Sequence, residues 1–339
     1  MGIRGDHPHL HRLVRGRHLV PHPLAHVQVR RRMAAIRNRT DRTRRLRRHR
    51  RPGVRMRVAR GVSAALTTLA LAATAGCGGA PATVRQPDGP TIAIGVAADE
   101  PGLSRWHDGG YSGFEVEVAR YVAKKLGYAN KQIVFKQVEP ANRLELLADG
   151  TVDLVVAGMP MPADGGDGDD ADGGLAANGV VSDGHATYAG PYLTTRQGLL
   201  ARPGDAAGID GVAALAGKSV CTVAGSGAKD ALLAAVPQGR TRERDTYPQC
   251  VTDLMVGTAD AIAGDAVTLA GLARDEGGTL VTRVKGVRYG SVRYGIAVQA
   301  GAVTLADDIA EALRDMRADG SYDAALDALA DATGWRQAR

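Results

Sequence analysis

Three cysteines are the residues of this 339-residue chain whose chemistry is easiest to interpret. Cys77 follows a basic segment at residues 55–60, an apolar stretch at 62–75 and a glycine, which is the order of regions in a secretion signal. We therefore expect the chain after Cys77 to work outside the cytoplasm, where thiols oxidise. Cys221 and Cys250 then form an even pair, which favours a disulfide, although two buried free thiols are the alternative.

The signal ends in the sequence Ala-Gly-Cys, and this ending resembles a bacterial lipoprotein signal. The resemblance implies that the Cys77 thiol is acylated and that Cys77 becomes the new N-terminus. An ordinary cleaved signal and a packed alanine-rich helix are the alternatives. Residues 56–77 are thus expected to be a lipoprotein signal peptide. Residues 78–90 are small, polar and rich in proline, and we expect them to tether a domain to the membrane.

The formal charge of +7 hides two oppositely charged parts. Residues 1–60 hold 19 Arg and two acidic residues, a net charge of +17, and subtracting this from +7 leaves −10 for residues 61–339. The arginine-rich run at 42–51 could attract nucleic acid, but it has no aromatic residue to stack on bases. We therefore expect no nucleic-acid partner. Residues 1–55 are expected to be a disordered leader, or an upstream start codon translated in error.

Residues that could carry catalysis or hold a metal are sparse in the exported part. It has two histidines, His107 and His185, and no cysteine besides the pair. Gly225 and Gly227 do not make a dinucleotide fingerprint, and the sequence has no glycine-rich phosphate loop with Lys-Ser/Thr. The aspartate-rich segment 163–184 lacks the carboxylate spacing of a calcium loop. The sequence therefore predicts no cofactor, no metal and no enzymatic activity.

The elements that must position any site alternate between strand and helix. Short apolar runs predict strands at residues 91–96, 133–138, 152–157, 218–223, 259–263 and 294–298. Helical spacing predicts helices at residues 114–126, 141–148, 267–274, 305–318 and 321–331, and one that ends at residue 236. This alternation predicts an α/β fold with a mostly parallel sheet, in a chain long enough for two lobes with cores of their own.

The order and spacing of short motifs resemble the extracytoplasmic solute-binding proteins of family 3, the polar amino-acid group that serves ABC importers. The resemblance is strongest to actinobacterial glutamate- and glutamine-binding lipoproteins, covers roughly residues 91–335, and implies a bridge between Cys221 and Cys250. The motifs are SGFEVEVA at 112–119, ANR at 141–143, GTVDL at 150–154, AGPY at 189–192, LAGK at 215–218, YGI at 294–296 and DGSY at 319–322.

The resemblance implies the two-lobed periplasmic-binding-protein (Venus flytrap) fold of type II. In that fold the chain crosses into a second lobe and returns, here near residues 193–197 and 289–294. Lobe 1 is expected to comprise residues 91–193 and 293–339, and lobe 2 residues 194–292. Ligand binds between the lobes, and closure excludes water and so strengthens charge-assisted hydrogen bonds.

The resemblance also implies how an amino acid is held. Asp265, at the end of a strand, would hold the ammonium group, although a helix-capping role is the alternative. Gly225, Ser226 and Gly227, at a helix start, would offer backbone N–H groups to the α-carboxylate, or form a plain tight turn. Arg143 would hold a side-chain carboxylate, or be a solvated surface arginine.

Asp99, Glu100 and Gly158 would line the same cleft. After the third predicted strand the family usually carries hydroxyl side chains and an arginine that holds the α-carboxylate. This chain has Gly-Met-Pro-Met-Pro-Ala-Asp-Gly-Gly there instead, so that arginine is missing. His185 and Arg196 are the two candidates to replace it.

The resemblance thus implies a monomeric receptor, anchored by lipid to the outer face of the cell membrane. It would capture a polar or acidic amino acid, glutamate or glutamine first, and deliver it to an ABC permease. Two alternatives remain open. One is a ligand-sensing lipoprotein for a membrane signalling partner, and the other is a dehydratase-like enzyme on the same fold.

Overall fold

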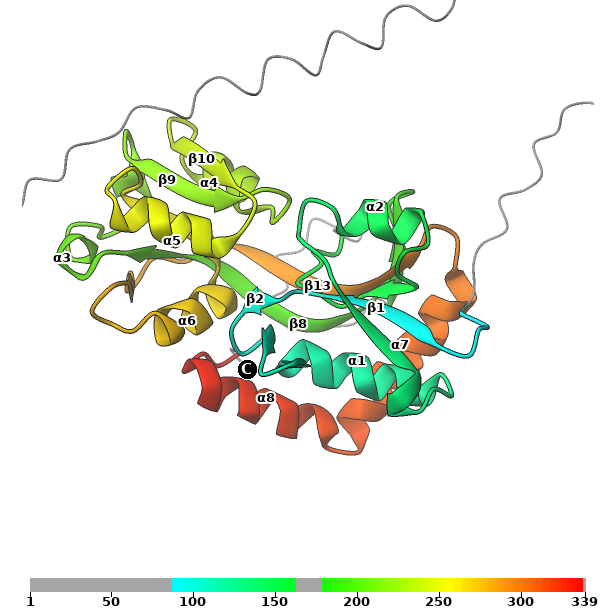
Figure 1. The fold of residues 1–339 in the computed structure, drawn as a ribbon. Helices are drawn as coiled ribbons and strands as arrows, with labels where there is room; N and C mark the ends of the chain where they lie inside the picture. The colour runs from blue at the N-terminus through cyan, green and yellow to red at the C-terminus, as the bar shows by residue number, and fades with distance from the viewer. Residues whose placement is uncertain (1–86, 163–178, 338–339) are drawn as a thin grey trace, which may run out of the picture. The chain divides into compact units, whose positions relative to one another are not determined.

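The computed structural model describes residues 87–162 and 179–337 (Figure 1). The leader, the signal with Cys77, most of the tether and most of the aspartate-rich segment lie outside these residues. What the sequence predicts for them therefore stays a prediction. None of the described helices is long and apolar enough to cross a membrane.

One mixed sheet runs through the described part of the chain. Its strands are β1 (Ile92–Val96), β5 (Ile133–Gln137), β6 (Leu154–Val155), β7 (Val180–Ser182), β8 (Ala186–Ala201), β9 (Ser219–Val223), β10 (Arg240–Arg244), β11 (Ala261–Asp265), β12 (Thr282–Arg283) and β13 (Tyr289–Gln299). Neighbours along the sheet follow the order β10, β9, β11, β8, β13, β6, β1, β5, and β7 and β12 also pair with β8. Every strand that the sequence predicts is present, with shifted ends.

The two ends of the sheet are parallel and its middle is antiparallel. β1 pairs in parallel with β5 and β6, and β9 does so with β10 and β11. β8 and β13 run antiparallel to each other and to their neighbours β11 and β6. The prediction of a mostly parallel sheet is therefore right for each end and wrong for the middle. Strands that carry the chain into a second lobe and back must run in opposite directions.

β8 and β13 are the long strands that connect the two lobes (Figure 1). β8 has 16 residues and β13 has 11. Leu193 pairs with Tyr294 and Gln197 with Tyr289, so the segments where the sequence places the two crossings lie side by side. The lobe boundaries expected at residues 193 and 292 stay a prediction.

Helices cover the sheet in both lobes. They are α1 (Phe114–Lys125), α2 (Arg143–Ala148), α3 (Pro203–Ala206), α4 (Ala228–Ala235), α5 (Tyr247–Met255), α6 (Ala266–Asp275), α7 (Val303–Ala318) and α8 (Ser321–Thr333). Here lobe 1 means the part built on β1, β5 and β6 with α1, α2, α7 and α8. Lobe 2 means the part built on β9, β10 and β11 with α3 to α6 (Figure 1).

Four short strands carry no apolar pattern that would predict them. β2 (Asp99–Glu100), β3 (Ser104–His107) and β4 (Gly110–Ser112) form a small antiparallel sheet where the sequence predicts a loop. β10 is an edge strand with three arginines and one glutamate among its five residues, and it is largely exposed. A strand that buries no face needs no alternation of apolar residues, so periodicity does not reveal it.

Each lobe has its own hydrophobic core. In lobe 2 the core includes Cys221 of β9 and Cys250 of α5, which are fully buried and joined by the predicted disulfide. Their Cα atoms are 5.5 Å apart and the bridge spans 29 residues of sequence. By the loop-entropy relation a bridge of this span stabilises the fold by about 3–4 kcal/mol.

α6 belongs to lobe 2 but also packs on lobe 1. Its residues Val267 and Ala270 lie in the hydrophobic cluster that α1, α7 and α8 build over β1. Thr268, on the same helix, is buried and donates a hydrogen bond to Glu100 of lobe 1. The two lobes are therefore in contact where α6 begins, directly after Asp265.

Candidate functional site

Four charged side chains are buried where the lobes meet. Glu100, Glu115, Arg143 and Asp265 are at most 6% exposed, and they interact electrostatically with one another. We call these four residues the cleft cluster. Burying a charge costs free energy unless partners replace the lost water, so such a group marks a binding or catalytic site.

Arg143 begins α2 and connects the lobes through backbone carbonyls. Its Nη1 donates to the oxygens of Ala157 at 2.7 Å and Gly158 at 3.3 Å, and its Nη2 donates to the oxygen of Gly225 at 3.0 Å. Gly225 belongs to lobe 2, whereas Arg143 and the other two carbonyls belong to lobe 1. Burial lowers the pKa of Arg143, and Glu100 opposes that effect. The alternative of a solvated surface arginine is therefore wrong.

Asp265 ends β11 and occupies the N-cap position of α6, but its side chain makes no capping hydrogen bond. Its carboxylate instead accepts hydrogen bonds from Gln197 Nε2 and the Tyr294 hydroxyl, which come from β8 and β13. Burial raises the pKa of Asp265 to about 6, and the hydrogen bonds from these two side chains oppose that rise. The carboxylate is thus held by the two crossing strands rather than used to begin the helix.

Glu115 is a site residue that the sequence analysis does not single out. It is fully buried in the first turn of α1. Its Oε1 accepts hydrogen bonds from the Tyr192 hydroxyl at 2.5 Å and from Gly158 N–H at 2.6 Å, while its Oε2 has no partner among the described residues. Burial raises the pKa of Glu115 to about 7. The sequence could have revealed it by helical spacing. Glu115 lies three residues before Val118 and seven before Val122, and therefore on the buried face of the helix.

Glu100 completes the cleft cluster, and Asp99 lies beside it. Glu100 Oε2 accepts a hydrogen bond from Thr268 Oγ1 at 3.3 Å. Burial raises the pKa of Glu100 well above its usual range, and the nearby Glu115 adds to the effect. Asp99 is half-buried, and burial raises its pKa too. The tyrosines Tyr192 and Tyr294, which the sequence analysis names only inside motifs, fill the space around these carboxyls.

The turn at Gly225, Ser226 and Gly227 is a tight turn whose hydroxyl is used locally. Ser226 Oγ donates to the Val223 oxygen at 2.7 Å and accepts from Ala228 N–H at 3.3 Å. Gly227 has a φ of +79° at the N-cap of α4. The turn reaches the cleft cluster through the Gly225 carbonyl, and its proposed role in holding an anion stays a prediction.

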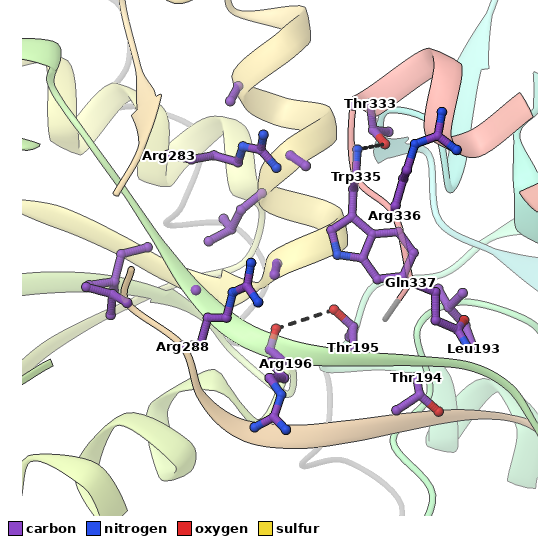
Figure 2. A pocket seen from close by; sticks show the side chains of 18 of the residues that line it. Leu193, Thr194, Thr195, Arg196, Arg283, Arg288, Thr333, Trp335, Arg336 and Gln337 are labelled. Carbon is purple, nitrogen blue, oxygen red and sulfur yellow. Dashed lines mark hydrogen bonds between the residues drawn. The ribbon is translucent and has the colours of Figure 1, made fainter. Parts of the chain in front are cut away.

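The two candidates to replace the missing arginine lie elsewhere. His185 and Arg196 are both exposed, and no hydrogen bond or ion pair among the described residues joins either side chain to the cleft cluster. Arg196 lines a different pocket, which also contains Trp335 (Figure 2). Within the cleft cluster, Arg143 is therefore the cation that is available to a ligand.

The lobes approach each other backbone to backbone at two glycines. A Cβ on Gly271 of α6 would lie 1.9 Å from the Pro101 oxygen of lobe 1, and one on Gly225 would lie 2.4 Å from the Pro140 oxygen. Separations this short are impossible, so any side chain at these positions forces the lobes apart. Gly271 is the cleaner position to test, because its backbone is helical and it sits inside α6.

We expect Gly271→Ala to weaken ligand binding at least tenfold, because a ligand held by both lobes must drive closure against the new contact. Calorimetric titration of the variant measures the loss. Gly204→Ala is the matched control, since a Cβ there meets nothing within 4 Å and Gly204 also lies in a helix of lobe 2. Equal affinities for the two variants would show that this conformation is not the one that binds ligand.

Comparisons with known proteins identify the family of this chain. Residues 92–164 match the model of a family described as bacterial extracellular solute-binding proteins, family 3. A glutamate-binding protein, GluB, of Corynebacterium efficiens is 30% identical over 246 residues, which are 68% of this chain and 76% of that protein. A glutamine-binding ABC transporter protein, GlnH, of Bacillus subtilis is 28% identical over 239 residues, 70% of this chain and 80% of that protein.

Solved structures show the same fold. An ancestral arginine-binding protein bound to glutamine superposes with a TM-score of 0.60 at 24% identity, over 70% of this chain and 96% of that one. A solute receptor for L-cysteine of Neisseria gonorrhoeae superposes with a TM-score of 0.61 at 24% identity, over 72% of this chain and 92% of that one. The predicted two-lobed fold is confirmed. The matched curated relatives named above are binding proteins rather than enzymes.

Proposed function

The chain belongs to the bacterial extracellular solute-binding proteins of family 3, and we propose that its ligand is an amino acid with an uncharged side chain. Glutamine is the preferred ligand, and glutamate binds more weakly. The chain is a solute receptor of the amino-acid ABC-transporter class and works outside the cytoplasm. Its curated relatives include both a glutamate-binding and a glutamine-binding protein, so similarity alone does not choose between the two. The charge of the cleft cluster supports the choice.

The cleft cluster holds one cation and three carboxyl groups. An amino acid brings an ammonium and an α-carboxylate, and each needs a partner of opposite charge once water is excluded. We assign Asp265 to the ammonium and Arg143 to the α-carboxylate, in place of the arginine that is missing after Gly158. Arg143 would exchange one of its backbone carbonyl partners for the ligand.

Glutamate brings a second carboxylate, and the cleft cluster offers no second cation to meet it. Above pH 7, where Glu115 is ionised, it would repel this carboxylate instead, since it is buried beside the assigned site. The side-chain amide of glutamine has the same shape without the charge, and its N–H groups could donate to the Glu115 carboxylate. This reverses the sequence-based assignment of Arg143 to a side-chain carboxylate.

The remaining parts of the proposal rest on the sequence. The receptor is anchored to the outer face of the cell membrane through a lipid on Cys77, acts as a monomer and passes its ligand to an ABC permease. It is not an enzyme, because buried carboxyls beside an arginine are accounted for by binding. Delivery to a permease is favoured over sensing for a membrane signalling partner because the curated relatives include a protein named as part of an ABC transporter.

Calorimetric titration of the purified protein with glutamine, glutamate, asparagine and aspartate tests the proposal. We expect micromolar or tighter binding of glutamine at pH 8, and glutamate at least tenfold weaker. The difference in affinity between glutamine and glutamate should narrow toward pH 6, because Glu115, whose pKa burial raises to about 7, then takes up a proton and no longer repels the second carboxylate. Tighter binding of glutamate than of glutamine at pH 8 would overturn the choice of ligand. No heat with any of the four would overturn amino-acid binding itself.

A further inference from the structure

A second site lies away from the cleft cluster, on the surface formed by the crossing strands. A cavity of about 1050 Å³ opens there between β8, α6, the segment 278–288 and the residues that follow α8 (Figure 2). We call it the hinge pocket. None of the four cleft-cluster residues lines it. The two sites share Tyr192, which lines the pocket and whose hydroxyl donates to Glu115 of the cleft cluster.

The charge of the hinge pocket is one-sided. Seven arginines and lysines line it, whereas none of the described residues that line it is Asp or Glu. This contrasts with the net charge of −10 that remains for residues 61–339 when the +17 of residues 1–60 is taken from +7. Seven positive charges around one cavity repel one another. A binding partner of negative charge would offset this repulsion.

These cations are also free to bind. Arg283, Lys285, Arg288 and Arg336 are exposed, and no ion pair or side-chain hydrogen bond within the described residues engages them. Arg317 is half-buried, donates from Nη2 to the Pro191 oxygen at 2.8 Å and lies over the Tyr322 ring at 4.6 Å from its centroid. Its Nη1 is buried without a hydrogen-bond acceptor among the described residues, which is uncommon, and an anion could supply one.

The hinge pocket has a wall of defined structure. Trp335 is only 9% exposed, and its indole forms part of the wall. Figure 2 shows Arg283 and Arg288 extending toward Trp335 from the opposite side of the pocket, and Arg336 beside Trp335. The backbone N–H of Trp335 donates to Thr333 Oγ1 at 3.1 Å, which fixes the start of the C-terminal segment against α8. In the same view the guanidinium groups of Arg196 and Arg336 point away from Trp335. The guanidinium groups of Arg283 and Arg288 suit an anion with several oxygens, because each guanidinium can bind two oxygens at once.

We propose that the hinge pocket binds an anion that carries a phosphate group. Phosphate oxygens match the fork of an arginine, and the cavity is larger than a single phosphate needs. The phosphate group comes either from a soluble compound or from the headgroup of an anionic phospholipid. Both sources present the same chemistry to Arg283, Arg288 and Arg317.

Titration of the purified protein with inorganic pyrophosphate at constant ionic strength tests the proposal. Binding is followed by calorimetry and by the fluorescence of Trp335 in the Trp106→Phe variant, since Trp106 is the other tryptophan of the chain. We expect saturable binding that the Arg283→Ala/Arg288→Ala double variant weakens at least tenfold. Both side chains are exposed, so the variant should fold normally.

A matched control separates the site from general charge. Lys131→Ala/Arg240→Ala removes two exposed positive charges that do not line the pocket, and it should leave binding unchanged. Equal losses in the two double variants, or no saturable binding, would overturn the proposal.

A third comparison identifies the source of the phosphate. The protein is sedimented with vesicles of phosphatidylglycerol or of phosphatidylcholine, with and without the Arg283→Ala/Arg288→Ala changes. Sedimentation with phosphatidylglycerol alone, lost in the double variant, assigns the pocket to a lipid headgroup. Pyrophosphate binding without vesicle binding assigns it to a soluble phosphorylated compound. Either result supports the shared chemistry, and the absence of both contradicts it.

Discussion

Asp265→Asn should weaken amino-acid binding at least a hundredfold. The carboxylate is 6% exposed and is held by Gln197 and Tyr294, so the ammonium of a ligand would meet it without water between them. A charge-assisted hydrogen bond in such surroundings is among the stronger polar contacts a protein makes. Asparagine keeps the shape and an acceptor oxygen but loses the charge. Calorimetric titration with glutamine measures the effect.

Asp230→Asn is the matched control for this change. Asp230 lies in the first turn of α4 in the same lobe, and its side chain is exposed. We expect its affinity to equal that of the unchanged protein. If Asp265→Asn binds glutamine within threefold of the unchanged protein, Asp265 serves only to hold Gln197 and Tyr294. The ammonium partner would then have to be another carboxyl of the cleft cluster.

The unliganded protein should be most stable near pH 5 and lose stability as the pH rises to 8. Burial raises the pKa of Glu115 from 4.5 to about 7, so the folded chain keeps this proton at a pH where the unfolded chain has released it. Such a carboxyl stabilises the fold fully at a pH below its pKa in the unfolded chain. The stabilisation is lost as the pH rises to its pKa in the folded chain. For Glu115 alone the loss is about 3 kcal/mol.

Glu115→Gln should flatten this pH dependence and raise the unfolding temperature at pH 8 by several degrees. Glutamine keeps an oxygen for the Tyr192 hydroxyl and for Gly158 N–H, and it carries no charge to bury. Scanning calorimetry between pH 5 and 8 measures both effects. Glu117→Gln is the control, because Glu117 lies in the same turn of α1 but is exposed. Identical curves for the two variants would show that the charge of Glu115 does not set the pH dependence.

Much of the local structure followed from the sequence because it depends on near neighbours. The apolar residues of β1 form a continuous run, and those of α1 recur at helical spacing, because these are the residues that each element buries. Both elements were therefore predicted within one residue of their ends. The motif order predicted the two-lobed fold and named Asp265 and Arg143 as candidate site residues. The even number of cysteines after the signal favoured the disulfide, which the fold contains.

Other features depended on contacts between distant segments. Glu115 lies on an apolar helix face, but only the folded chain places it against Gly158 and Tyr192. Arg143 was predicted to meet a ligand carboxylate, whereas the fold surrounds it with backbone carbonyls from both lobes. Short, largely exposed strands such as β3 were missed because they bury no continuous face and so show no alternation of apolar residues.

The sequence by itself determined the kind of protein, through alternating strands and helices and the motifs of an amino-acid receptor. The tertiary structure alone decided the balance of charge at each site. It collected three carboxyls around one arginine in the cleft, and it gathered cations from β8, α6, α7 and the C-terminal segment into the hinge pocket. The reason is that a charge's environment depends on distance in space, and residues far apart in the chain leave no shared periodicity that would reveal it.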